Sequence, residues 1–139
     1  MNILFFLKPK STLTVLETSY TIRQSLEVME KSGYTAVPLI DEEGKYIGTI
    51  SEGDFLWFFK SLGVFNIKEA EKISISTILR HRDNEPIRIT EDMMNLIHLA
   101  KVENFIPVID DRDMFIGIVT RQDIIDYFLK NKMNVDIYD

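Results

Sequence analysis

The sequence predicts a mixed α/β (α+β) protein in which one small unit of helices and strands occurs twice. Across the 22 positions from Pro38 to Phe59, seven residues are identical to the residue 69 positions later. Apolar residues at helical spacing, Ile22, Leu26 and Met29, precede the repeated stretch. Because each copy is one supersecondary unit, we expect it to need its twin for burial.

The order of elements is the same in both copies. We expect the first copy to contain a helix over 21–31, strands over 36–40 and 45–50 joined by a turn at 41–44, and a helix from Ser51. A further extended segment at 13–16 precedes them. In the second copy we expect a helix over 94–102, strands over 106–109 and 114–119 joined by a turn at 110–113, and a helix over 120–129.

These elements divide the chain into five parts. We expect an N-terminal arm (1–9), a first domain (10–60), a linker (61–72), a second domain opened by a short amphipathic helix at 73–79 (73–130), and a frayed tail (131–139). The apolar run 2–7 is too short to span a membrane and lacks a basic leader. We therefore expect the arm to pack on the body or on a second subunit.

Composition excludes several classes of function. The net charge of −6 argues against a broad nucleic-acid interface, and no segment resembles a membrane span. The chain has no cysteine, which excludes disulfides and thiolate chemistry and fits a cytoplasmic location. We find neither a nucleophile–histidine–acid arrangement nor a phosphate-binding glycine loop, so we expect no enzyme activity and no metal site.

The same polar turn stands at one point of each copy. Ser51-x-x-Asp54 and Thr120-x-x-Asp123 each follow a strand and begin a helix. One interpretation is a helix cap. The other is a nucleotide site, because a helix N-terminus attracts phosphate, a hydroxyl can donate to it, and a carboxylate can accept from ribose.

Each copy resembles a CBS domain, and the pair resembles a tandem CBS (Bateman) module. The matching positions are Pro38, Asp41, Gly48, Ser51 and Asp54, and again Pro107, Asp110, Gly117, Thr120 and Asp123. The resemblance implies a duplicated β-α-β-β-α unit, related by a pseudo-two-fold axis with the two sheets packed together. It also implies a regulatory protein that modulates an unidentified partner protein.

The resemblance further implies adenosine ligands in clefts between the units: AMP, ADP, ATP, S-adenosylmethionine or cyclic di-AMP. The hydroxyls of Ser51 and Thr120 would meet phosphate, and Asp54 and Asp123 would hold ribose. Adenine would be framed by main-chain groups at Thr35, Ala36, Val37, Phe105 and Ile106.

The segment 33–38 resembles small stand-alone bacterial CBS pairs, some of which bind cyclic di-AMP and then release a protein partner. In these, Thr35 and the segment around Thr14 would line the purine. The second copy differs, because Phe105 would either stack on a base or block the pocket. Arg121 suits a phosphate chain or a solvated surface equally.

Two further segments allow alternatives. The run 55–59 is apolar all round and includes Trp57, so we expect a homodimer through these helices. The basic cluster 80–82 is either a solvated loop or a contact for phosphate or a partner. The alternative function is a ligand-free dimerisation or docking module in which the Ser/Thr-x-x-Asp turns act only as caps.

Overall fold

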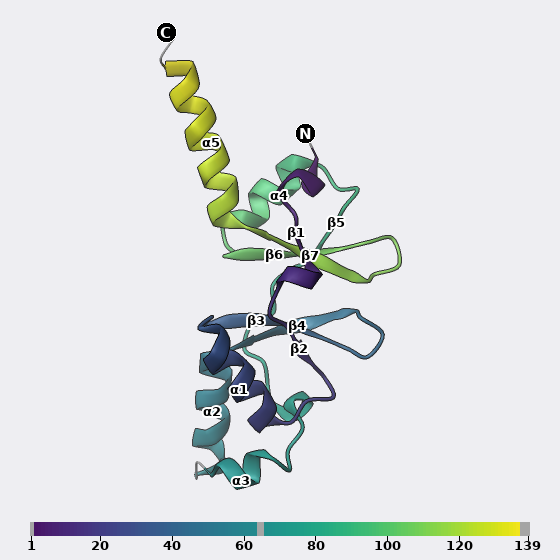
Figure 1. The fold of residues 1–139 in the computed structure, drawn as a ribbon, viewed down its shortest axis with the longest axis vertical. Coiled ribbons are helices and arrows are strands. Elements are labelled where there is room, and N and C mark those ends of the chain that lie inside the picture. Colours follow the sequence, from purple (N-terminus) through teal and green to yellow (C-terminus); the bar gives the residue numbers. More distant parts are fainter. Residues whose placement is uncertain (1, 64–65, 137–139) are drawn as a thin grey trace. The chain divides into compact units, whose positions relative to one another are not determined.

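The structure, a computed structural model, describes residues 2–63 and 66–136 and divides into two compact units (Figure 1). One unit, Thr14–Asp83, contains the first repeat and is called the repeat-1 unit. The other contains the second repeat and joins Met1–Leu13 to Asn84–Asp139; it is called the repeat-2 unit. Each unit has its own sheet and its own buried core.

The repeat-1 unit has a three-stranded sheet of order β2-β3-β4, with β2 parallel and β4 antiparallel to β3. Its elements are β2 (Leu16–Glu17), α1 (Ile22–Ser32), β3 (Ala36–Ile40), β4 (Tyr46–Ser51), α2 (Glu52–Leu62), α3 (Ile67–Ala70) and the 3-10 helix η3 (Ile75–Thr77). Apolar residues of α1 and α2, such as Met29 and Phe55, pack against Val37, Leu39 and Ile50 of the sheet.

Local signals define the ends of α1 and α2. Thr21 caps α1 by accepting from the N–H of Gln24, whose side chain accepts from the N–H of Thr21 in return. Gly33 ends α1 and Gly63 ends α2, both with a φ of 73°, which glycine adopts without a Cβ penalty.

The repeat-2 unit has a four-stranded sheet of order β1-β7-β6-β5. Its elements are η1 (Ile3–Phe6), β1 (Lys8–Pro9), η2 (Lys10–Thr12), β5 (Ile87–Arg88), α4 (Met93–Ala100), β6 (Phe105–Ile109), β7 (Phe115–Thr120) and α5 (Arg121–Asp136). The register repeats that of the other sheet: Pro107 pairs with Ile118 as Pro38 pairs with Thr49.

The N-terminal segment is part of the repeat-2 unit. Ile3 and Phe6 are buried in its core beside Leu96 and Val119. The β1 strand pairs with β7, placing Lys8 opposite Ile118. Residues that precede the first repeat thus complete the sheet and core formed by the second.

The predicted fold class is confirmed: both repeats are β-α-β-β-α units in a mixed α/β chain. Two segments differ from expectation in detail. Only Ile75–Thr77 of the expected helix at 73–79 is helical, and Ile75 and Ile78 are buried in the core of the repeat-1 unit. The expected tail from residue 131 continues α5 to Asp136, while 64–65 in the linker and 137–139 lie outside the described residues.

Glycine at two equivalent strand positions leaves room for a neighbouring segment. A Cβ on Gly117 would lie 2.2 Å from the main-chain oxygen of Lys8, and one on Gly48 would lie 2.2 Å from Oδ1 of Asp83. Both distances are far below contact between non-bonded atoms. The repeated glycines therefore allow chain segments to cross β4 and β7 closely, as expected for glycine within a strand.

This close contact predicts that Gly117→Ala destabilises the protein. The neighbour is a backbone oxygen, which cannot rotate away, so β1 must shift, and we expect a loss of about 1–3 kcal/mol in the free energy of unfolding. Urea denaturation measures this value. Gly53→Ala is the control, because its Cβ would meet only ordinary contacts within α2 and should be neutral or stabilising. Equal effects of the two substitutions would contradict the steric argument.

Candidate functional site

The two Ser/Thr-x-x-Asp turns are built alike by the pairing of neighbouring strands. Ser51 ends β4 and pairs with Ala36, the first residue of β3. Thr120 ends β7 and pairs with Phe105, the first residue of β6. Each predicted hydroxyl therefore lies directly across the ladder from a residue predicted to frame the base.

Backbone hydrogen bonds join each strand to the helix that follows. The N–H of Glu52 donates to the carbonyl of Thr35 (2.9 Å), and the N–H of Arg121 donates to the carbonyl of Asn104 (2.8 Å). These bonds satisfy a donor that a helix N-terminus otherwise leaves without a partner. The segment predicted to frame the base and the helix N-terminus are thus held together in both units.

The hydroxyl of each turn acts as a helix cap. Ser51 Oγ accepts from the N–H of Asp54 (3.3 Å), and Thr120 Oγ1 accepts from the N–H of Asp123 (3.1 Å). The N–H of Ser51 donates in return to Oδ2 of Asp54 (2.9 Å), which completes a capping box. A capping hydroxyl accepts through oxygen, so its own hydrogen can still be donated to a phosphate.

The carboxylate of Asp54 is enclosed. It is only 1% exposed, and its Oδ1 accepts two hydrogen bonds from His81, one from the main-chain N–H (3.0 Å) and one from the imidazole Nδ1 (2.6 Å). Since a carboxylate only accepts, Nδ1 is the protonated nitrogen in this contact. Together with the hydrogen bond from the N–H of Ser51, the carboxylate of Asp54 accepts three hydrogen bonds.

An ion pair anchors the segment that delivers His81. Asp83 Oδ1 accepts from the N–H of Thr49 on β4 (3.0 Å) and from Nε of Arg80 (2.8 Å). A further N–H of Arg80 donates to the carbonyl of Ile47 (3.4 Å). The hydrogen bond to Asp83 raises the pKa of Arg80, although burial of the guanidinium acts to lower it. The segment 80–83 is therefore bound along β4 on both sides of His81.

The carboxylate of Asp123 is more open. Its side chain is 36% exposed, and its Oδ2 lies 3.4 Å from Nζ of Lys8 on β1. Lys8 is itself about half exposed. An exposed lysine–carboxylate pair is worth about 0–1 kcal/mol, so the ammonium can exchange partners at little cost. The two repeats thus present the same motif in unlike surroundings.

Two polar side chains shape the second turn. Arg121 Nε donates to the carbonyl of Ala100 (2.7 Å), which ties the start of α5 to the end of α4. The buried side chain of Asn84 donates through Nδ2 to the carbonyl of Phe105 (2.7 Å). Phe105 is half-buried, and its main-chain carbonyl already accepts the hydrogen bond from Asn84.

The remaining predicted residues divide by exposure. Val37 and Ile106 are buried in the cores, so they can offer a ligand only main-chain groups. Ala36 is half-buried and Thr35 is exposed. Thr14, half-buried, stands two residues before β2 at the start of the repeat-1 unit.

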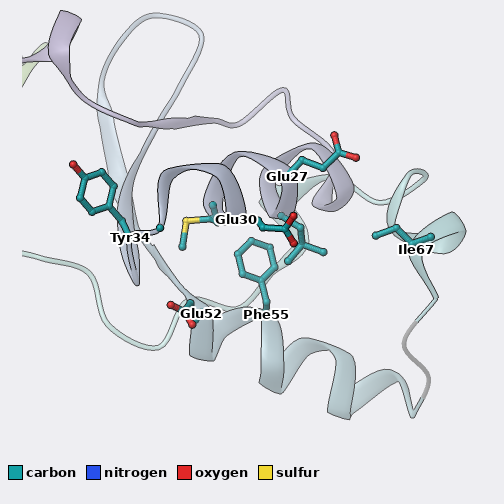
Figure 2. A pocket seen from close by; sticks show the side chains of 9 residues that line it. Glu27, Glu30, Tyr34, Glu52, Phe55 and Ile67 are labelled. Atoms are coloured by element: carbon teal, nitrogen blue, oxygen red, sulfur yellow. The ribbon is translucent and has the colours of Figure 1, made fainter.

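A pocket of about 520 Å³ lies between α1 and α2 and includes none of the predicted site residues (Figure 2). Phe55 of α2 and Glu30 of α1 face each other across it, with Tyr34 at one end. Its lining residues are Leu26, Glu27, Met29, Glu30, Gly33, Tyr34, Glu52, Phe55 and Ile67. Three carboxylates line this pocket and repel phosphate, so it does not suit a nucleotide.

Sequence patterns alone did not identify His81, Lys8 or Asn84 as neighbours of the turns. His81 lies 27 positions from Asp54 along the chain, and the contact between them leaves no periodic signal. The basic cluster 80–82 was visible in the sequence, but its contact with an acid of the motif was not.

In the part of the chain that the structure describes, no helix is both long and apolar enough to cross a membrane.

Comparison with known proteins gives one family and several similar folds. The family model of the CBS domain matches residues 9–61 and 81–130. A CBS domain-containing protein of Dictyostelium discoideum is 27% identical over 132 residues, with 89% of each chain covered. An L-aspartate semialdehyde sulfurtransferase of Methanocaldococcus jannaschii is 28% identical over 107 residues, which are 77% of this chain and 19% of the relative. The chain thus spans about a fifth of that enzyme's length.

Solved structures agree with the fold. A structure of CbpB in complex with cyclic di-AMP has a TM-score of 0.87 and 24% identity, covering 100% of this chain and 91% of the other. CbpB of Listeria monocytogenes, also in complex with cyclic di-AMP, has a TM-score of 0.81 and 20% identity, covering 96% and 98%. The CBS-pair protein CBSX2 of Arabidopsis thaliana has a TM-score of 0.74 and 20% identity, covering 95% and 96%.

The unlike surroundings of the two acids predict unlike effects on stability. Asp54→Ala removes a buried acceptor and leaves three partly buried donors without it, and we expect a loss of about 1–3 kcal/mol in the free energy of unfolding. Asp123→Ala removes an exposed ion pair, and we expect a loss of about 0.5 kcal/mol. Urea denaturation at neutral pH distinguishes the two values. Similar losses for both variants would show that the enclosure of Asp54 does not contribute to stability.

Proposed function

Because the chain belongs to the CBS domain family, we propose that it is a regulatory protein that senses an adenine nucleotide. The observation that supports this most directly is the doubled turn. In each unit a hydroxyl and a carboxylate stand at the N-terminus of an α-helix, across from the strand that would frame the base. This combination matches the parts of a nucleoside phosphate.

Each group of the turn has a distinct task in the proposed complex. The helix N-terminus provides a partial positive charge of about half an elementary charge for the phosphate. Ser51 or Thr120 donates its hydroxyl hydrogen to a phosphate oxygen. Asp54 or Asp123 accepts from ribose hydroxyls, and main-chain groups at Ala36 or Phe105 contact adenine. None of these steps makes or breaks a covalent bond, so the role is binding and not catalysis.

The proposed ligand is AMP, ADP, ATP or cyclic di-AMP. Cyclic di-AMP is favoured because the two CbpB structures of similar fold contain it. Thr35 in the first repeat suits an adenine, and Arg121 in the second repeat suits a phosphate. A ligand that binds one conformation more tightly shifts the population toward it, which would alter affinity for a partner protein. We place the protein in the cytoplasm, where such nucleotides are free.

Calorimetric titration with AMP, ADP, ATP, S-adenosylmethionine and cyclic di-AMP tests this function. We expect saturable binding of at least one of them, and no binding of GMP or cyclic di-GMP, which have the same phosphates but another base. Asp123→Ala should weaken binding at its turn at least tenfold, which corresponds to about 1.4 kcal/mol. Circular dichroism establishes that the variant is folded.

A flat titration for every adenine ligand would contradict the proposal. It would favour the second candidate, a docking module in which the turns are caps alone. The complete capping box at Ser51 and Asp54 supports that candidate, because it satisfies the helix N-terminus without any ligand. The exposed apolar side chains of α2 support it as well, since they require a partner surface.

We propose that this surface joins two copies of the chain. Leu56 and Trp57 of α2 are 60% and 49% exposed, and the pocket of Figure 2 beside α2 is lined in part by apolar side chains such as Phe55. A homodimer formed through α2 of each copy would cover both the exposed side chains and the pocket. A separate surface would remain for the protein target.

Sedimentation velocity at micromolar concentration tests the dimer. We expect the wild type to sediment as a dimer and Trp57→Glu as a monomer, because burying a charge in an apolar interface opposes association. Leu79→Glu is the matched control, since Leu79 is 78% exposed but lies outside the helices. A monomeric wild type would overturn this part of the proposal.

A further inference from the structure

The carboxylate of Asp54 is already occupied by groups of its own unit, and this has a consequence for binding. We infer that His81 blocks the first turn, so that a nucleotide binds at the Thr120–Asp123 turn, and at the Ser51–Asp54 turn only after the imidazole has moved. The inference rests on the proposed function and deepens it, because it names the residue that decides which of two similar turns is used.

Hydrogen-bond capacity is the first argument. A carboxylate offers about four lone-pair sites, and Asp54 uses three of them for Ser51 and for the two N–H groups of His81. The two hydroxyls of a ribose need two acceptor sites on an accessible edge. With 1% of the residue exposed, Asp54 has no such edge until the imidazole leaves Oδ1.

Anchoring of the segment is the second argument. Arg80 and Asp83 bind β4 on either side of His81, and Gly48 has no side chain to push them away. The imidazole is therefore held beside its acceptor before any ligand arrives, and it loses little conformational freedom when it binds. If the closed state is populated at 99%, the apparent affinity of a competing ribose falls about 100-fold.

The second turn lacks this obstacle. Lys8 contacts Asp123 through an exposed pair at 3.4 Å, and its flexible ammonium can turn toward an incoming phosphate. His81 provides two donors to one oxygen from a bound segment, whereas Lys8 provides one ammonium. Both side chains are 49% exposed, so the difference between them lies in the anchoring of the segment. The same motif is therefore closed in the repeat-1 unit and accessible in the repeat-2 unit.

Stoichiometry measured by calorimetry tests the inference, with AMP as the probe because its ribose has both hydroxyls. We expect one AMP per wild-type chain, lost in Asp123→Ala. We expect two per chain for His81→Ala, with the added site lost again in the double variant His81→Ala/Asp54→Ala. His98→Ala is the matched control, because it removes an exposed histidine of α4 and should leave one site.

A conservative variant separates blocking from a general loss of stability. His81→Asn places an amide N–H where Nδ1 lies, so it should restore the contact with Asp54 and return the stoichiometry to one. Two equivalent sites in the wild type, or one site in His81→Ala, would overturn the inference and leave the proposed function intact. If neither the wild type nor His81→Ala bound any of AMP, ADP, ATP, S-adenosylmethionine and cyclic di-AMP, both the inference and the proposed function would be overturned.

Discussion

The N-terminus of an α-helix has N–H groups that need acceptors, and the way this protein supplies them determines the rest of each unit. In both repeats a carbonyl before one strand accepts the first helical N–H, and a hydroxyl at the end of the next strand accepts the third. These bonds fix the strand pair, the turn and the helix relative to one another. The same hydroxyl and carboxylate are the groups proposed to bind a nucleotide. Because the cap and the proposed site share one geometry, the presence of the cap does not exclude the site.

Chain connectivity makes the two repeats different. The repeat-1 unit ends with the segment 80–83, which leads into the second repeat, and the repeat-2 unit includes residues 1–13, which precede the first. Each motif is thus covered by a segment from outside its own repeat. One segment places an imidazole on Asp54, and the other places an ammonium near Asp123. Because these segments share no sequence pattern, the duplicated motif has different surroundings in the two units.

The fold was predictable from local signals, and the contacts around the acids were not. The helix predicted over 21–31 follows from the apolar spacing of Ile22, Leu26 and Met29. It begins one residue later, at Ile22, because Thr21 is its cap. The elements of the second copy could then be predicted from those of the first, because the sequence repeats. Contacts such as Lys8 with Asp123 join distant parts of the chain, and neither residue has a feature that indicates the other. Likewise α5 continues beyond residue 131, where the polar sequence gave no apolar periodicity to predict it.

The strength of a binding motif therefore depends on how many donors its acceptor already holds. Asp54 and Asp123 are both aspartates at the third position of a helix, and each follows the hydroxyl residue of its motif by three positions. One has three hydrogen bonds and is nearly inaccessible, and the other has one exposed ion pair. A ligand must replace those partners before it gains any contact, so the difference enters its binding free energy directly. In a family defined by a repeated motif, the residues that distinguish one repeat from the other are then outside the motif, on the segments that cover it.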